Sequence, residues 1–158
     1  MKKIVLLLAI IFCSSCASKR VYVCGGQISD ISRLSLVRLR VLSVYDTAIS
    51  YEISQSLPRT LTITKFRSEN CEYWSHVVYQ KSHTLLESEY ENIIMLLNKA
   101  LETPPIEKHV GLDGEEWMLE SSVYNYTAII YWSPGVESEK RGLEGVVNLK
   151  SYFSKFEN

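Results

Sequence analysis

The order of two kinds of hydrophobic spacing along the chain is the feature that most constrains its fold. From Arg33 to Val44, aliphatic residues alternate with Arg38 and Arg40, which is the period of two of a half-buried strand. Further strands are predicted over Asp46–Ser54, Thr60–Phe66, Tyr73–Gln80, Glu115–Ser121 and Tyr124–Trp132. The short polar connections between the first four strands favour an antiparallel meander.

The period changes to three or four residues in two places. After a capping box formed by Ser88 and Glu91, apolar residues at helical spacing predict a helix that ends near Leu101. A second helix is predicted over Ser138–Phe156, and Asp113-Gly114 predicts a hairpin turn between the two helices. The sequence therefore predicts an α+β fold, a mostly antiparallel sheet with two helices packed on one face, as a single domain over residues 31–158.

The N-terminus has the pattern of an export signal. Lys2 and Lys3 precede an unbroken apolar run, Ile4 to Phe12, and small residues follow it. A helix needs about 20 apolar residues to cross a hydrocarbon core of ~30 Å, and this run is too short for a permanent span. We therefore expect residues 1–15 to be a signal peptide. The alternative is a buried N-terminal strand or helix of the domain.

Two cleavage chemistries fit this N-terminus. Ser14-Ser15-Cys16 resembles the lipobox of bacterial lipoproteins, although Cys13 stands where that pattern has an aliphatic residue. The resemblance implies a lipid on Cys16, attachment to a membrane, and a place in the cell envelope, either periplasmic or on the outer surface. Ordinary signal cleavage after Ala17 is the alternative.

Two further cysteines would remain in the exported protein. Residues 16–30 are expected to be a linker, and Cys24 lies within it, whereas Cys71 lies in the predicted domain. One disulfide between Cys24 and Cys71 is possible in an oxidising compartment, and two free thiols are the alternative.

Motifs of familiar chemistry are missing from the sequence. There is no CxxC, GxSxG or glycine-rich phosphate loop, and His76, His83 and His109 lack the spacing of metal ligands. We therefore predict no metal, no cofactor and no catalytic residue. The formal net charge of -1, without clustered basic residues, argues against a nucleic-acid partner.

The most distinctive stretch is Gly111–Glu120, which is followed by Tyr131-Trp132-Ser133-Pro134. It resembles an uncharacterised bacterial family with an LDGxxWxxE…WSP pattern and a C-terminal helix, over roughly residues 85–155. The chain departs from that pattern at Tyr131, where the family has Arg, and the resemblance implies no activity. Acidic and aromatic residues of this stretch form a candidate binding surface: Asp113, Glu116, Trp117, Glu120, Tyr126 and Trp132.

Within this stretch, alternation places Trp117 and Leu119 on one face of a strand and Glu116, Met118 and Glu120 on the other. A hairpin whose aromatic residues simply pack under the helices is the structural interpretation of the same residues.

Two functions are consistent with these patterns. The first is a membrane-anchored envelope lipoprotein that acts as a non-catalytic binding or structural module, with an envelope protein or a glycan as partner. The alternative is a cell-envelope hydrolase that acts on glycans through Asp113, Glu116 or Glu120. The missing catalytic motifs favour the first.

Overall fold

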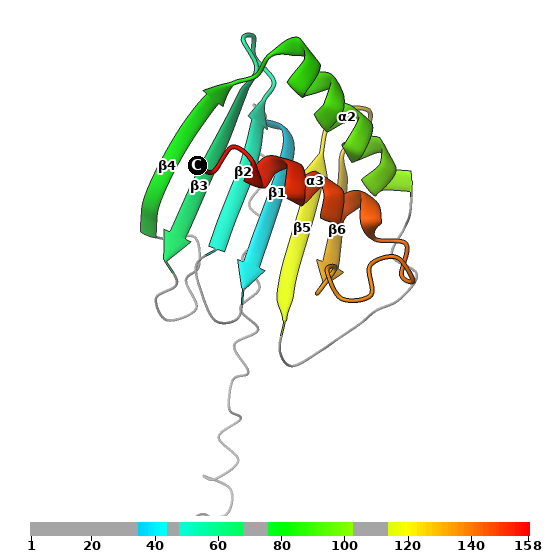
Figure 1. Cartoon of the computed structure of the whole chain (residues 1–158). Coiled ribbons are helices and arrows are strands. Elements are labelled where there is room, and N and C mark those ends of the chain that lie inside the picture. Colours follow the sequence, from blue (N-terminus) through cyan, green and yellow to red (C-terminus); the bar gives the residue numbers. More distant parts are fainter. Residues whose placement is uncertain (1–34, 44–47, 68–75, 103–113) are drawn as a thin grey trace, which may run out of the picture.

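The computed structural model describes residues 35–43, 48–67, 76–102 and 114–158, which form an antiparallel sheet and two helices (Figure 1). The strands are β1 (Ser35–Ser43), β2 (Ala48–Ser54), β3 (Thr60–Arg67), β4 (His76–Thr84), β5 (Glu115–Ser121) and β6 (Thr127–Trp132). The helices are α2 (Glu87–Glu102) and α3 (Glu144–Ser154). Within these residues the sheet has six strands in the order β4-β3-β2-β1-β5-β6.

The first four strands form the predicted meander, and β5 departs from it. Each of β1 to β4 pairs with the next, whereas β5 pairs antiparallel with β1 on the side away from β2. β6 then pairs with β5 and ends the sheet. Both sides of β5 are therefore occupied, so Gly114 does not join two neighbouring strands and the predicted hairpin turn is wrong.

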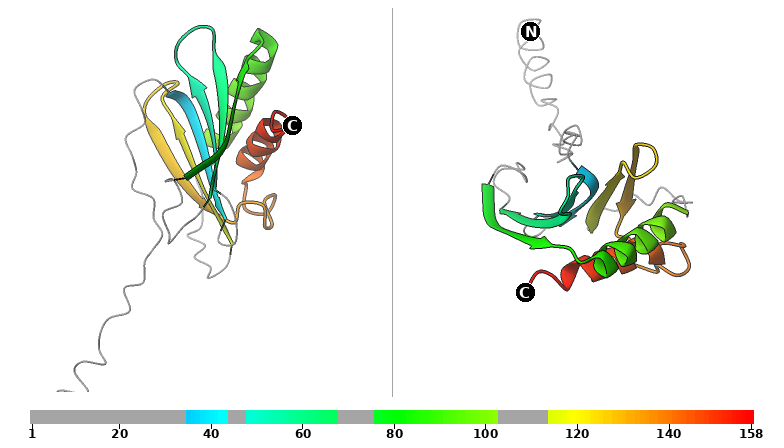
Figure 2. Two further views of the ribbon diagram at one scale, coloured as in Figure 1. Left: turned by 90° about the vertical axis from the view of Figure 1, so that its left-hand side faces the viewer. Right: turned by 90° about the horizontal axis from the view of Figure 1, so that it is seen from above.

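Both helices cover the same face of the sheet (Figures 1 and 2). Because apolar residues recur every three or four positions in each helix, one stripe of α2 and one of α3 face the strands. Ile93, Leu97 and Ala100 of α2, and Val146, Leu149 and Phe153 of α3, are buried there. The predicted α+β class with two helices on one face is confirmed.

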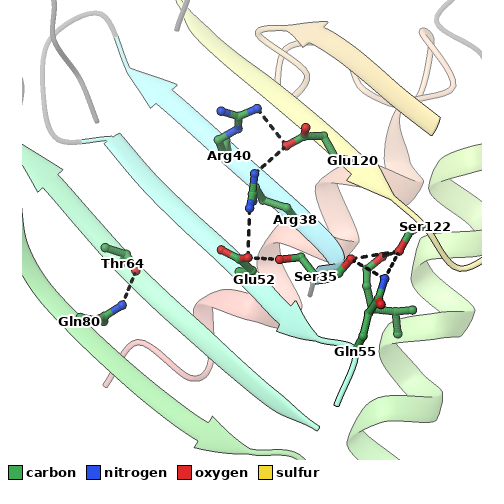
Figure 3. Close-up of polar contacts among 10 residues, drawn as sticks. Ser35, Arg38, Arg40, Glu52, Gln55, Thr64, Gln80, Glu120 and Ser122 are labelled. Atoms are coloured by element: carbon green, nitrogen blue, oxygen red, sulfur yellow. Dashed lines mark hydrogen bonds and ion pairs between the residues drawn. The ribbon is translucent and has the colours of Figure 1, made fainter. Parts of the chain in front are cut away.

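The alternation in β1 determines what each sheet face carries. Val37, Leu39 and Val41 point into the core beneath the helices. Arg38 and Arg40 project from the opposite side, which we call the open face because it is turned away from α2 and α3 (Figure 3).

The N-terminus of α2 is capped differently from the prediction. The helix begins at Glu87, and the Glu89 carboxylate accepts a hydrogen bond from the Leu86 N–H at 2.8 Å. In a capping box, the side chain of the third helical residue accepts a hydrogen bond from the backbone N–H of the residue before the helix. Glu89 and Leu86 form this half of the box. The contact holds the pKa of Glu89 below its ordinary value. The box predicted at Ser88 and Glu91 was therefore placed two residues too late.

The terminal helix starts later than its apolar pattern suggested. Residues 138–142 form turns, and α3 begins only at Glu144. Gly142 adopts φ of +67°, a left-handed conformation that a helix interior does not allow. The predicted start at Ser138 is therefore wrong by six residues.

Candidate functional site

A row of charged side chains crosses the open face from β2 to β5 (Figure 3). The Arg38 guanidinium lies between two carboxylates, with Nη2 3.1 Å from Glu52 Oε1 and Nη1 3.8 Å from Glu120 Oε2. Arg40 Nη2 donates to the same Glu120 Oε2 at 2.9 Å. We call these four residues the ion-pair row.

The ion-pair row is buried although it lies on the face away from the helices. Arg38 and Arg40 are 8% and 6% exposed, and Glu120 is fully buried. Only Oε2 of Glu120 meets the arginines, and Oε1 has no hydrogen-bond partner among the described residues. Buried charges of this kind are tolerated when they are paired, and removing one partner leaves the other uncompensated.

A small hydrogen-bond network anchors one end of the row. The Ser35 hydroxyl donates to Glu52 Oε1, next to the Arg38 contact. The Gln55 amide donates to the Ser35 carbonyl oxygen at 3.2 Å and to the Ser122 hydroxyl at 3.0 Å. The start of β1 is therefore tied to the ends of both of its neighbouring strands.

Glu116 and Trp132, two residues of the predicted binding surface, lie on the open face next to the ion-pair row. They are direct cross-strand partners on β5 and β6, and both are partly buried. Burial raises the pKa of Glu116, and the nearby Arg40 charge offsets part of that rise. A carboxyl group beside an indole on an accessible sheet face can make polar and stacking contacts with a ligand.

The other candidate residues on β5 and in its hairpin do not join this face. Trp117 points to the helix side, where it is 4% exposed, and its indole N–H donates to Glu115 Oε2 at 2.8 Å. Tyr126 is exposed in the connection between β5 and β6, at the end of the hairpin opposite Glu116 and Trp132. Among the described candidates, the structure therefore places Glu116, Glu120 and Trp132 on the open face, where only Glu116 and Trp132 are direct neighbours.

Several predictions fall outside the described residues. Cys16, Cys24, Cys71, Asp113 and His109 lie in segments whose structure is not described. Among the residues that are described, no group of three His, Cys, Asp or Glu side chains could hold a metal ion. Neither α2 nor α3, the helices of this part of the chain, has the length and apolar composition needed to cross a membrane.

His83 is engaged in packing within the described sheet. Its Nε2 lies 3.0 Å from Glu89 Oε2, and its ring is 4.9 Å from the ring of Phe156. The side chain therefore links β4 to the first turn of α2 and to the C-terminal residues.

Two described residues of the LDG…WSP pattern, Gly114 and Ser133, lie side by side. Gly114 precedes β5 and Ser133 follows β6, and the Ser133 N–H donates to the Glu115 carbonyl oxygen at 2.6 Å. Arg141 then fixes the chain after β6, because its guanidinium donates to the carbonyl oxygens of Trp132 and Ser133, both at 2.8 Å. These residues of the pattern have a structural role at one end of the hairpin.

Tyr131 lies on the helix-facing side of β6. It is 2% exposed, and its hydroxyl donates to the Ala100 carbonyl oxygen in the last turn of α2 at 3.2 Å. Burial raises the pKa of Tyr131 to about 12, so the side chain is neutral at physiological pH. Tyr131 therefore joins the sheet to α2 and belongs to the core.

Sequence patterns missed the residues that complete the site. Alternation placed Arg38 and Arg40 on the open face but gave no sign that they are buried. Their partners are 14 and 80 residues away, at Glu52 and Glu120. Only the pairing of β1 with both β2 and β5 brings these charges together, and no local pattern encodes that pairing.

Comparison of the chain with protein-family models, curated proteins and solved structures found no match.

Proposed function

We propose that this chain is an exported envelope protein, held at a membrane by lipid on Cys16, whose folded domain is a non-catalytic binding or structural module. The observation that carries the proposal is the N-terminal sequence, in which two lysines, nine apolar residues and Ser14-Ser15-Cys16 follow one another. Each buried CH₂ of an acyl chain contributes ~0.8 kcal/mol to membrane binding, so more than one chain makes a stable anchor. We also propose kinship with the LDGxxWxxE…WSP family.

The geometry of the carboxylates supports a non-catalytic role. Glu120 is fully buried and its Oε2 is engaged by two arginines, so it is poorly placed to exchange protons with a substrate. Glu116 lies four residues away on the same strand, which separates the Cα atoms by roughly 13 Å. Paired carboxylates of glycosidases are ~5–9.5 Å apart, so this arrangement favours binding over bond cleavage.

The open face is the surface we propose for the partner, which is an envelope protein or a glycan. It presents Trp132 and Glu116 at one side, and in the middle the buried ion-pair row supports it, with Glu52 as the most exposed member of the row. Hydroxyl and amide groups follow on β3 and β4, where Thr62 bonds Ser82 and Gln80 bonds Thr64. Such a surface offers donors, acceptors and the aromatic side chain of Trp132 to a polar macromolecule.

Fractionation of expressing cells tests the anchor. The wild-type protein should sediment with membranes, and Cys16→Ser should appear in the soluble fraction or accumulate uncleaved. Cys13→Ser is the matched control, because it changes a neighbouring cysteine that the proposal leaves unmodified, and it should behave as the wild type. If processed Cys16→Ser protein, without its uncleaved precursor, associated with membranes as fully as the wild type, the basis for a lipid on Cys16 would be removed.

Site-specific photo-crosslinking in intact cells tests the proposed surface. A photoreactive residue at Thr62 on the open face should give an adduct with a protein or a glycan. The same residue at Asn148, an exposed position on α3, is the control and should give none. The open face would lose its proposed role if Thr62 gave no adduct beyond that of Asn148.

One observation favours the alternative of a glycan hydrolase. Burial raises the pKa of Glu116, as in carboxyl groups that act as general acids. Under this alternative the purified protein would release reducing ends from cell-wall glycan, and Glu116→Gln would abolish the release. Product formation that Glu116→Gln leaves unchanged would rule out Glu116 as the acid.

A further inference from the structure

β4 is an outer strand of the sheet. It pairs antiparallel with β3, and no other strand of the described residues lies beside it (Figure 1). An outer strand presents a row of backbone N–H and C=O groups to its surroundings, which can pair with a further strand. At nine residues, β4 is one of the two longest strands in the sheet.

The first half of β4 exposes three consecutive apolar side chains. Val77, Val78 and Tyr79 are 57%, 59% and 40% exposed. Val78 has no Cα partner on β3, because Tyr79 pairs with Lys65 and Val77 with Phe66 across an irregularity in the register. Sheet edges of soluble proteins are ordinarily protected by charged side chains, proline or bulges. The irregularity at Val78 is a local device of this kind, but the three exposed apolar side chains around it indicate a contact surface.

Two polar side chains next to this apolar segment, Gln80 and Lys81, are engaged within the molecule. Lys81 Nζ donates to the carbonyl oxygen of Asn158, and the Gln80 amide donates to the Thr64 hydroxyl at 3.4 Å. These contacts draw both side chains over the faces of the sheet. The apolar side chains of Val77, Val78 and Tyr79 therefore dominate the outer edge.

We propose that β4 pairs with β4 of a second copy of this chain, antiparallel and about a two-fold axis near Val78, so that two sheets join edge to edge. In this register Val78 faces its own counterpart and Val77 faces Tyr79, which matches apolar residues with apolar residues. His76 faces Gln80, and Lys81 lies beyond the paired segment, so no two like charges oppose each other. β4 has no acidic residue that would select a basic foreign strand.

The contact is small and should therefore be weak in dilute solution. Stable interfaces bury about 1,200–2,000 Å² in total, and one pair of strands supplies less than that. The pairing does not depend on a lipid anchor. If the chain is anchored as proposed above, confinement to a membrane surface raises its effective concentration and favours the dimer.

The test uses the protein as purified from expressing cells, in a density-matched detergent, by analytical ultracentrifugation across the micromolar range. We expect a monomer–dimer equilibrium with a dimer fraction that rises with concentration. Val78→Lys should lower the association constant at least about tenfold, because two lysines would then face each other across the axis. Val136→Lys changes another exposed valine, on the turn after β6, and should leave the association constant unchanged.

Disulfide crosslinking makes the test independent of how Val78→Lys folds. In a background with Cys24→Ser and Cys71→Ser, Val78→Cys should form a covalent dimer on mild oxidation, and Val136→Cys should not. A monomer at every concentration, equal crosslinking at the two positions, or crosslinking of Val78→Cys only to a different protein would overturn the proposal.

Discussion

Gly114 and Ser133 lie against each other where β5 begins and β6 ends, and the Ser133 hydroxyl oxygen occupies the place that a β carbon at position 114 would take. The same hydroxyl accepts a hydrogen bond from the Glu115 N–H at 3.3 Å. The contact holds the two ends of the hairpin together and explains why glycine is required at the end of Leu112-Asp113-Gly114.

Gly114→Ala should destabilise the fold by about 1–3 kcal/mol, because the added methyl group forces Ser133 from its position. Gly135→Ala is the matched control, since a β carbon there would meet no atom within 4 Å. We expect that control to change stability by less than about 0.5 kcal/mol. Urea unfolding followed by tryptophan fluorescence measures both, and equal effects would contradict the account of Gly114.

Gly145→Ala tests the contact between the two helices. A β carbon at position 145 would lie 2.6 Å from the Lys99 carbonyl carbon and 2.7 Å from the Ala100 nitrogen, both in the backbone of α2. Alanine favours a helix over glycine by up to ~1 kcal/mol, but overpacking costs about 1–3 kcal/mol, so the substitution should destabilise.

The control for Gly145→Ala is Asn148→Ala, at an exposed position of α3. It should be neutral or slightly stabilising, since alanine has the higher helix propensity. Thermal unfolding compares the two variants. A Tm for Gly145→Ala at or above that of Asn148→Ala would show that α2 and α3 do not approach each other as closely as described.

Glu120→Gln should be among the most destabilising substitutions of the open face. It removes the charge that Arg40 Nη2 meets at 2.9 Å and Arg38 Nη1 meets at 3.8 Å, so that less negative charge compensates the two buried guanidinium groups. Breaking a buried pair in this way costs about 3 kcal/mol or more.

The control is Glu137→Gln, which breaks an exposed contact with Lys140 worth at most about 1 kcal/mol. Denaturant titration in low and high salt should show that only the Glu137 effect is weakened by salt.

Glu157 should make stability depend on pH. Burial alone would raise its pKa, but hydrogen bonds from Lys65 at 2.8 Å and from the Tyr51 hydroxyl at 2.5 Å outweigh burial and hold the pKa below its ordinary value. A carboxyl group whose pKa is lower in the folded state stabilises the fold above its unfolded pKa, and that contribution is lost as pH falls through the folded pKa.

Glu157→Gln should therefore be less stable than the wild type at neutral pH and should lose less stability on acidification. Unfolding free energies measured from neutral pH down to about pH 3 give the comparison. Glu139→Gln, at an exposed position, is the control and should follow the wild type. Parallel curves for Glu157→Gln and wild type would show that the contacts of Glu157 with Tyr51 and Lys65 contribute nothing.

Local patterns were sufficient for the parts of the fold that depend on local periodicity. The alternation in β5 correctly separated Trp117 and Leu119 from Glu116 and Glu120, although Trp117, proposed for the binding surface, lies in the core. The three- and four-residue spacing from Tyr90 onward correctly predicted α2; its end was expected near Leu101, and the helix ends at Glu102. Each of these features follows from which side of one strand or helix is apolar.

Features that depend on distant partners were not predictable from one sequence. The apolar spacing from Ser138 onward suggested a helix, but the contacts of Arg141 with carbonyl oxygens and the left-handed Gly142 stabilise turns instead. The burial of Arg38 and Arg40 depends on the pairing of β1 with β5, which follows it by more than 70 residues. Long-range pairing of this kind leaves no local periodic signal.

The central claim is that the chain is exported and carries lipid on Cys16, and the mass of its N-terminal peptide tests that claim most directly. Mass spectrometry of the protein isolated from membranes should find Cys16 as the first residue, with a diacylglyceryl group on its sulfur. A chain that begins at Met1, or at Ser18 without lipid, would contradict it.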